Sequence, residues 1–346
     1  MTRGIAPLLL GYQSFDREVN IAGIIFNRVG GSRHAAKLRE SVEHYTDIKV
    51  LGAVYNHPDM EIEERHLGLM PSNESGAAEA QIARIRDLVA EQVDLNLLRE
   101  IAATAGEGVC NTPLRADGRG VLHTPSSSSP LRIAICQDPS FGFYYPGDLE
   151  ALQQAGAELV PVNTLNDAAL PANIDGLFIG GGFPETHMQQ LAANVSMRES
   201  IRAAINNGLP TYAECGGLMY LSRSLVWNGQ QADMVGVIPG DAVMHPKPQG
   251  RGYVKLQETA DMPWPGGDLE KTINAHEFHY SRLENLTTNG KFAYCMRRGT
   301  GIDGQHDGWI YRNLLASYTH MRDTSQYRWA QRFVEFTRQV KRKQVS

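Results

Sequence analysis

Residues 209–225 read LPTYAECGGLMYLSRSL, and this stretch decides the fold class of the chain. A short apolar run that ends in a polar residue and two glycines is typical of a buried strand entering a tight turn. The apolar spacing after the glycines predicts a helix. Cys215 lies at the turn, as in the nucleophile elbow of hydrolases, where small neighbours such as Gly216 and Gly217 make room for a sharp bend.

The surrounding sequence repeats this alternation of strands and helices. We expect strands at 131–137, 158–162 and 176–182, and helices at 149–157, 197–208 and 218–225. Such alternation predicts an α/β fold with an open, mostly parallel sheet, whose ligand sites lie at the carboxyl ends of the strands. Two glycine turns, at 180–182 and 216–217, fall at such ends.

The N-terminal part predicts a smaller α/β unit. Apolar runs at 21–27 and 49–54 are typical of buried strands, and helical spacing over 32–45 between them predicts parallel pairing. A long helical stretch follows at about 75–105. Residues 111–130 are rich in Pro, Ser and Gly, which predicts a linker between a domain at 1–110 and a domain at 131–346.

Composition narrows the class of protein. The 346 residues suffice for two domains, and 42% hydrophobic with 21% charged residues is normal for a soluble globular chain. The net charge of -5 argues against a nucleic-acid binder, and no apolar run is long enough for a membrane span. The four cysteines are widely spaced without a CxxC pair, so we expect no metal site and a reducing, cytoplasmic location.

Cys215 is the candidate nucleophile. A thiol at a helix N-terminus faces the positive end of the helix dipole, which favours the reactive thiolate. Backbone N–H groups of Gly181, Gly182 or Gly216 could hold an oxyanion beside it. The alternative is a buried cysteine beside a packing pair of glycines, and the motif alone leaves both open.

A cysteine nucleophile needs a base. His320 ends NLLASYTH (313–320), which is typical of a strand that would present the histidine at the same edge as Cys215. The alternative is an ordinary histidine at a sheet edge. His276 and His279 in HEFHYSR (276–282) are rival bases; their spacing is not HExxH, which disfavours a zinc helix.

Several motifs, in order, carry a family resemblance. They are FGFYYPGDLEAL (141–152), GLFIGGGFPE (176–185), YAECGGLMYL (212–221), AHEFHYSRL (275–283) and LLASYTH (314–320). Residues 131–338 thereby resemble the class I glutamine amidotransferase domain of cobyrinic acid a,c-diamide synthases. The resemblance implies that Cys215 attacks the side-chain amide of glutamine and that His320 activates it. The family usually has a further histidine two positions later, where this chain has Arg322.

The N-terminal part is also similar to that family. Residues 11–30 and 64–74 resemble the latter half of its ATP-dependent domain, which is related to dethiobiotin synthetases. The resemblance implies ATP and Mg²⁺ as cofactors and places Asn27 at the adenine. The alternative for Asn27 is a turn-forming residue before Arg-Val-Gly.

The phosphate-binding loop of the family is missing from this sequence. No GxxxxGK followed by Ser or Thr occurs, and GGSRHAAK (30–37) has only the glycines. Three explanations stay open. The chain is an incomplete version of a longer protein, which we favour; or a separate chain supplies the loop; or the synthetase activity is lost and a glutaminase or binding role is kept. The expected protein partner is a second copy in a homodimer, or a chain that carries the phosphate-loop half.

The resemblance implies glutamine-dependent amidation of acetate carboxylates on a tetrapyrrole, as in cobalamin biosynthesis. Arg251 and His276 are the expected contacts to that acid substrate. Sirohaem or sirohydrochlorin is an alternative acceptor. From other classes, a different cysteine hydrolase and a non-catalytic tetrapyrrole-binding or scaffold protein also remain; release of glutamate from glutamine separates them.

Overall fold

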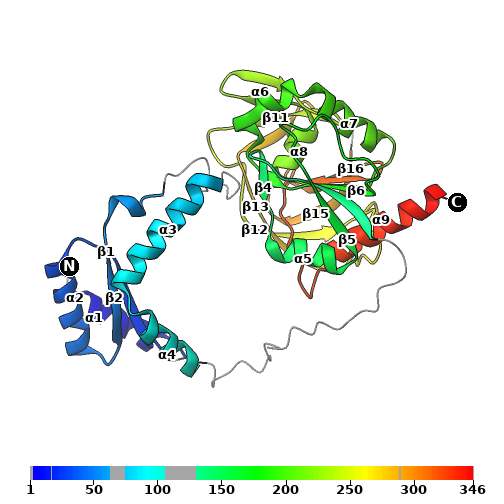
Figure 1. Cartoon of the computed structure of the whole chain (residues 1–346). Coiled ribbons are helices and arrows are strands. Elements are labelled where there is room, and N and C mark those ends of the chain that lie inside the picture. Colours follow the sequence, from blue (N-terminus) through cyan, green and yellow to red (C-terminus); the bar gives the residue numbers. More distant parts are fainter. Residues whose placement is uncertain (1–2, 17, 63–74, 106–129, 288–289, 346) are drawn as a thin grey trace. The chain divides into compact units, whose positions relative to one another are not determined.

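A computed structural model describes residues 3–16, 18–62, 75–105, 130–287 and 290–345. Figure 1 shows the chain as two compact units, Met1–Pro125 and Ser126–Ser346, and each is described here by itself. Nearly all of the expected linker at 111–130, and the segment 64–74, lie outside the described residues.

The N-terminal unit is built on a small parallel sheet. Strands β1 (Gly23–Val29) and β2 (Lys49–Tyr55) pair in parallel and are joined by helix α2 (Ser32–Tyr45), as expected. The other elements of this unit are α1 (Ile5–Phe15), η1 (Pro58–Met60), α3 (Ser75–Gln92) and α4 (Leu95–Ala105). Its main described core cluster consists of eight buried residues: Leu9, Phe26, Val29, Ala35, Leu38, Val42, Ile48 and Val50.

The helical stretch expected at 75–105 is two helices. The break is at Asp94, whose carboxylate accepts the N–H of Asn96 at 3.1 Å and of Leu97 at 2.9 Å, which is the pattern of a helix N-cap. Its own N–H donates to Leu51 of β2 at 2.8 Å. The sheet therefore fixes the point where α4 begins.

The C-terminal unit contains a nine-stranded sheet with helices on both faces. The elements of its first half are β3 (Leu131–Cys136), β4 (Phe141–Phe143), α5 (Pro146–Gln154), β5 (Ala157–Val162), β6 (Gly176–Ile179), β7 (Gly181–Gly182), η3 (Pro184–His187), α6 (Met188–Ala193), α7 (Val195–Asn206), β8 (Thr211–Glu214) and α8 (Gly216–Leu221). The elements of its second half are β9 (Ser222–Trp227), β10 (Gln230–Asp233), β11 (Ile238–Met244), β12 (Gly250–Glu258), β13 (Thr272–His279), β14 (Ser281–Glu284), β15 (Lys291–Arg298), β16 (His306–Tyr311), β17 (Leu314–Ser317) and α9 (Trp329–Val345).

The large sheet is parallel in one half and antiparallel in the other. Its order is β13-β12-β15-β16-β17-β8-β6-β3-β5. The strands from β17 to β5 pair in parallel, which confirms the expected α/β fold, whereas β13 to β17 pair in antiparallel fashion. Cys215 follows β8, which pairs in parallel with β17 on one side and β6 on the other.

Neighbouring residues on each parallel strand point to opposite faces, as a pleated strand requires. On β8, Ala213 packs in the core beneath α7 and α8, and Tyr212 packs in the core with α5 and α9. Figure 1 shows the same division, with α7 and α8 on one side of the strands and α5 and α9 on the other. Both faces are covered, so the sheet is a rigid platform for the residues at its edge.

Two expected elements end earlier than the sequence indicated. The helix expected at 218–225 stops at Leu221, because residues from Ser222 onward form β9 and pair with β10 and β11. The strand expected at 313–320 ends at Ser317, and His320 follows it in an isolated bridge to His276. Tertiary pairing overrides the local pattern in both places.

Candidate active site

The turn at Cys215 is strained in the way that a nucleophile elbow requires. Cys215 has φ 47° and ψ -98° between the end of β8 and the start of α8. A non-glycine residue in this region costs about 1–3 kcal/mol and persists only where its surroundings hold it. Here the N–H of Cys215 donates to Ser317 at 2.7 Å, and its carbonyl accepts the N–H of Met219 at 3.1 Å.

The two glycines after Cys215 are required by close contacts. A Cβ atom on Gly216 would lie 2.9 Å from the backbone nitrogen of Gly182, and one on Gly217 would collide with the carbonyl of Ile179. Any side chain here would push the helix away from β6 and β7. The predicted elbow is therefore present, with Cys215 itself 7% exposed.

His320 lies next to the Cys215 thiol, at the edge of the sheet where the sequence places it. Strand β17 pairs in parallel with β8, with Ser317 opposite Glu214, so the segments that follow both strands leave the sheet together. The imidazole of His320 is within hydrogen-bonding reach of the Cys215 thiol. A Cβ atom on Gly181 would lie 2.6 Å from the His320 ring. The backbone of the first glycine turn therefore packs directly against this imidazole.

A buried carboxylate fixes the segment that carries His320. Asp307, on β16, accepts the N–H of Tyr318 at 3.0 Å, the N–H of Thr319 at 2.9 Å and the hydroxyl of Thr319 at 2.6 Å. The N–H of His320 donates to the carbonyl of His276 at 2.8 Å. These bonds leave the histidine backbone little freedom relative to the elbow.

Glu214 is a site residue that the sequence analysis missed. Its carboxylate is 4% exposed and lies 3.3 Å from Nδ1 of His320. It also accepts the N–H of Met321 at 3.0 Å and the hydroxyl of Tyr212 at 2.5 Å. The signal in the sequence was a glutamate at the end of a strand that is otherwise fully buried, because glutamates are almost never buried unless paired.

These neighbours set the charge of His320. Burial works to lower its pKa, but hydrogen bonds with Cys215 and then with Glu214 outweigh burial and raise the pKa to about 10. The ring therefore carries a proton at neutral pH. A protonated imidazole beside a thiol favours the thiolate, as in cysteine hydrolases.

His276 lies beside His320 rather than against the thiol. The two rings stack with centroids 5.0 Å apart and planes 18° apart, and His276 Nε2 is 3.4 Å from the hydroxyl of Tyr145. Arg322 covers the Tyr145 ring at 4.0 Å. Burial, followed by the nearby His320, lowers the pKa of His276, so its ring is neutral at pH 7.

His279, the other rival base, is held in a different environment. It is buried, stacks on the ring of Tyr318 with centroids 4.0 Å apart, and has Nδ1 2.8 Å from the carbonyl of Ser281. Among the remaining described cysteines, Cys136 is fully buried on β3, and burial raises the pKa of its thiol. Cys110 lies outside the described residues.

The remaining predicted site residues lie farther out. Arg251 is exposed on β12, opposite Phe278 of β13, with its guanidinium 5.8 Å from that ring. Asn27 belongs to the N-terminal unit and is exposed on β1, where its side chain accepts the N–H of Arg28 at 2.9 Å. The roles of Gly181, Gly182, Gly216, Arg251, His276 and Asn27 stay predictions.

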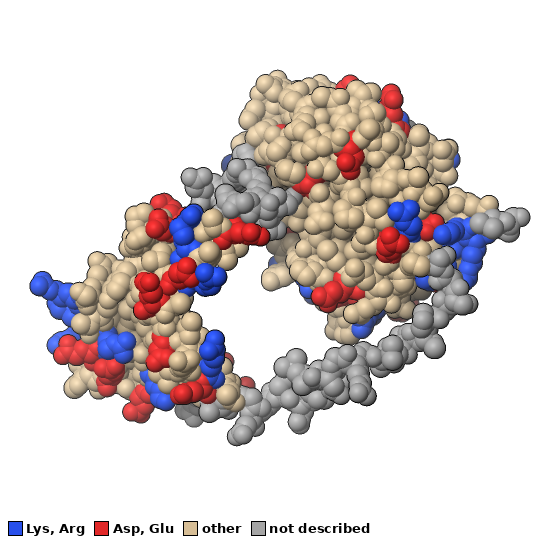
Figure 2. Space-filling view, viewed as in Figure 1, with Lys and Arg blue, Asp and Glu red and all other residues tan. Residues whose placement is uncertain are grey.

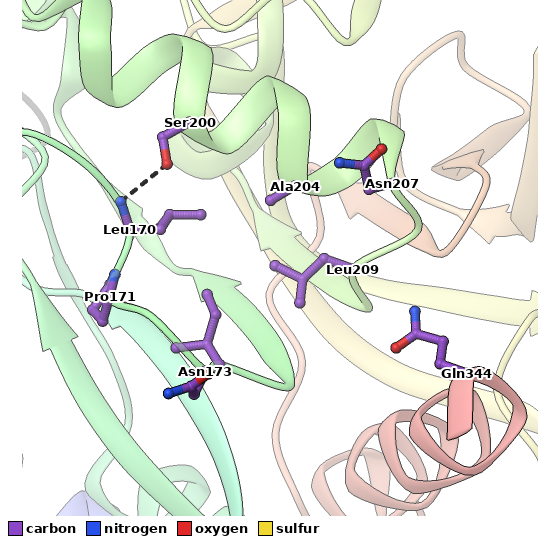
Figure 3. A pocket seen from close by; sticks show the side chains of 9 residues that line it. Leu170, Pro171, Asn173, Ser200, Ala204, Asn207, Leu209 and Gln344 are labelled. Atoms are coloured by element: carbon purple, nitrogen blue, oxygen red, sulfur yellow. Dashed lines mark hydrogen bonds between the residues drawn. The ribbon is translucent and has the colours of Figure 1, made fainter. Parts of the chain in front are cut away.

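A separate hollow of about 330 Å³ lies at the opposite edge of the sheet. Figure 3 shows its lining, which includes Ser200 and Leu209. Leu209 precedes the first residue of β8, whereas Cys215 follows the last, so this hollow is not part of the Cys215 site.

A second hollow, of about 520 Å³, lies where β1 leads into α2. It is lined by Gly30, Gly31, Ser32, Arg33, His34 and Lys37. The lining offers cationic side chains but no carboxylate, so it does not fit a magnesium-bound nucleotide. Within the described ranges, no group of three or more His, Cys, Asp or Glu is placed to hold a metal, and no helix is both long and apolar enough to cross a membrane.

Comparison with known proteins adds independent information. Residues 132–326 match the family model for the CobB/CobQ-like glutamine amidotransferase domain. The cobyrinate a,c-diamide synthase of Magnetococcus marinus is 42% identical over 98% of this chain and 72% of its own length. That of Methanosarcina acetivorans is 39% identical over 93% of this chain and 67% of its own length.

Solved structures give a more distant likeness. A glutamine amidotransferase from Methylobacillus flagellatus is 16% identical over 57% of this chain and 72% of its own length, with a TM-score of 0.38. No residue role is transferred across so low an identity. On the family match and the extent of the curated relatives, the chain belongs to the cobyrinate a,c-diamide synthase family, and residues 132–326 are its CobB/CobQ-like glutamine amidotransferase domain.

Proposed function

We propose that this chain hydrolyses glutamine at Cys215 and delivers the ammonia for amidation of acetate carboxylates on a tetrapyrrole. The observation that carries the proposal is the thiol on a strained turn beside a protonated imidazole that a buried carboxylate holds. The names of the relatives, cobyrinate a,c-diamide synthases, support cobyrinate over sirohaem or sirohydrochlorin as the acceptor.

The reaction begins at the side-chain amide of glutamine. The Cys215 thiolate attacks the amide carbon. The C–N bond then breaks as the imidazolium of His320 transfers its proton to the departing nitrogen. Ammonia leaves, and a thioester joins the glutamyl group to Cys215. Backbone N–H groups of the turn at Gly181 and Gly182 support the oxyanion that forms on the way.

The second half of the reaction regenerates the site. His320, now neutral, takes a proton from water, and the resulting hydroxide attacks the thioester carbon. Glutamate leaves, and the proton stays on His320 beside the Cys215 thiolate. Glu214 accepts from Nδ1 of His320 throughout, which keeps the other nitrogen directed at the sulfur and stabilises the imidazolium.

The ligase half of the function rests on the family alone. In the family that this chain resembles, ATP and Mg²⁺ activate the acceptor carboxylate. The hollow where β1 leads into α2 has no carboxylate in its lining and does not fit a magnesium-bound nucleotide. We propose that a separate chain or a further part of the protein supplies the phosphate loop.

The test is release of glutamate and ammonia from glutamine by the purified chain. We expect release by the native chain and none by Cys215→Ala. A diazo-ketone analogue of glutamine should label Cys215, as located by peptide mass mapping. Labelling at Cys136 or Cys295 instead, or hydrolysis of peptides without hydrolysis of glutamine, would overturn the assignment in favour of another cysteine hydrolase. A chain that binds a tetrapyrrole and hydrolyses nothing would be the non-catalytic relative.

A further inference from the structure

The motif FGFYYPGDLEAL (141–152) has no part in the proposed mechanism, yet its first residues pack against the first glycine turn. Strand β4, at the start of the motif, pairs with β7 in a two-stranded sheet of their own. Tyr144 follows β4 directly, and its ring lies against Gly180: a Cβ atom on Gly180 would lie 2.5 Å from Tyr144 Cε1. A glycine is therefore required opposite this ring.

The hydroxyl of Tyr144 joins the ends of two neighbouring strands of the large sheet. The last paired residues of β3 and β6 are Ile135 and Phe178. Beyond this pair, the hydroxyl accepts the N–H of Gly180 at 2.9 Å and donates to the carbonyl of Cys136. Gly180 and Cys136 are both buried, so these backbone groups need a partner inside the protein. The hydroxyl thus takes the place of the next strand-to-strand hydrogen bond.

The turn that begins at Gly180 touches both sides of the candidate active site. A Cβ atom on Gly181 would lie 2.6 Å from Cε1 of His320, so the Gly181 backbone packs on the imidazole. A Cβ atom on Gly216, at the start of α8, would lie 2.9 Å from the backbone nitrogen of Gly182. A displacement of Gly180 would therefore move peptide groups that lie against the base and against the elbow.

The two ends of this turn are held by different kinds of group. At the far end, the N–H of Phe183 donates to the carbonyl of Ser140 at 2.9 Å, and a Cβ atom on Gly182 would collide with the same carbonyl. At the near end, the N–H of Gly180 is held by the side chain of Tyr144. The side-chain bond can be removed by a substitution, whereas the backbone contact cannot.

We propose that Tyr144 is a positioning residue for glutamine hydrolysis, whose hydroxyl holds the glycine turn so that the N–H groups of Gly181 and Gly182 meet the oxyanion formed at Cys215. The inference rests on the proposed glutaminase function. An oxyanion donor acts at about 2.7–3.1 Å from the charged oxygen, and a misplacement of about 1 Å costs roughly 10²-fold in rate. The oxyanion is absent from bound glutamine, so the hydroxyl should affect turnover more than substrate affinity.

The test begins with Tyr144→Phe, which removes the hydroxyl and keeps the ring against Gly180. We expect kcat for glutamine hydrolysis to fall roughly 10- to 100-fold, while KM changes less than about threefold. Glutamate γ-semialdehyde, in which an aldehyde replaces the amide of glutamine, forms a tetrahedral adduct with a thiol. Its affinity should fall by the same factor as kcat/KM. Gly180→Ala should give the same pattern, because its methyl group would push the turn away from the Tyr144 ring.

Alkylation of Cys215 distinguishes a displaced turn from a damaged pair of catalytic groups. The rate at which iodoacetamide alkylates Cys215 depends on the thiolate and needs no oxyanion donor. We expect this rate and its pH profile, followed by peptide mass mapping, to be the same in native and Tyr144→Phe protein. Slower alkylation or a shifted profile would show that the substitution disturbs Cys215 and His320 themselves, which would overturn the proposal.

The matched control is Tyr311→Phe, which also removes one hydrogen bond of a partly buried tyrosine. The Tyr311 hydroxyl donates to Asn206 of α7 at 3.0 Å, at the end of the sheet where β8 begins rather than ends. This variant should keep native kcat and KM. Equal kcat in the two variants would mean that Tyr144 has no special role in turnover, and a rise in KM at native kcat would assign Tyr144 to substrate binding. Either result contradicts the proposal.

Hydrogen exchange separates this inference from the proposed function. The amides of residues 180–182 should exchange at least about fivefold faster in Tyr144→Phe than in native or Tyr311→Phe protein, whether or not the chain hydrolyses glutamine. An active native chain whose Tyr144→Phe variant keeps native kcat would refute the positioning role alone. A native chain that releases no glutamate and forms no adduct with the aldehyde would refute the glutaminase function, and the exchange rates would then report a brace without a catalytic role.

Discussion

The parallel strands of the C-terminal unit are covered on both faces, and its exposed large apolar side chains are few, such as Tyr253 on β12, whereas the smaller N-terminal unit leaves many large apolar side chains in solvent. Of residues in the N-terminal unit, Phe15 is 93% exposed, and Leu8, Tyr12 and Ile25 are each more than two-fifths exposed. Figure 2 adds that charged side chains gather on the visible face of the N-terminal unit more densely than on that of the other. The C-terminal unit therefore has the buried framework that an active site needs. The N-terminal unit has a small core and apolar side chains exposed on its surface.

The site residues follow the same division. Cys215, His320 and Glu214 all lie at the ends of strands with both faces buried, and Asp307 anchors them from the next strand. The predicted ATP contact Asn27 lies on a two-stranded sheet with one small core. Precise placement of reacting groups requires locked supporting side chains, and only the C-terminal unit provides them.

The largest expected effect tests whether activity belongs to one unit alone. Cys215→Ala should reduce glutaminase activity at least about 10⁴-fold, because the nucleophile is lost. Asn27→Ala in the other unit and Cys295→Ala on β15 should leave the rate within about twofold. The measurement is glutamate release at saturating glutamine. A large loss in Asn27→Ala would break the division between the units.

The next effect concerns the carboxylate that holds His320. Glu214→Gln should lower kcat roughly 10³-fold, because the imidazole loses the partner that orients and stabilises it. Glu214 raises the pKa of His320, so its loss should let the imidazolium lose its proton at a lower pH. The alkaline limb of the rate profile should therefore move to lower pH. Tyr212→Phe, which keeps the carboxylate, is the control and should keep the limb in place.

Stability should divide between the units in the same way. Ile201→Ala removes a fully buried side chain from the core beneath α7 and should cost about 3 kcal/mol of unfolding free energy in that unit. Leu38→Ala should cost about 2 kcal/mol and shift only the unfolding of the N-terminal unit. Urea unfolding followed by glutaminase activity and by circular dichroism distinguishes them. A shared shift of both transitions would show that the units unfold together.

The smallest effect concerns the exposed apolar surface. Phe15→Ser should change the unfolding free energy by less than about 0.5 kcal/mol, because its ring is almost wholly in solvent already. Phe26→Ser, on β1 in the same unit, replaces a buried ring and should unfold that unit. If Phe15→Ser were as damaging as Phe26→Ser, the exposed side chain would be covered in solution, and the contrast between the units would be smaller than the structure indicates.

Local patterns in the sequence predicted much of the fold. The helix at 32–45, the strands that carry the two glycine turns and the parallel pairing of the first unit are all present at or near their expected bounds. Each of these elements has a regular spacing of apolar residues and ends at a glycine or a polar residue. Both signals lie within a few residues of sequence. Where the signal was weaker, as at 75–105 and 218–225, tertiary pairing with a neighbouring strand decided the end of the element.

The elbow at Cys215 and its likeness to a family followed from the amino-acid sequence alone, because a nucleophile turn needs small residues at fixed offsets. The tertiary structure decided which histidine meets the thiol and that Glu214 holds it. Those facts depend on residues 106 positions apart meeting at one edge of a sheet. Pairing of that kind is set by packing and register across the whole sheet, which a local pattern does not contain.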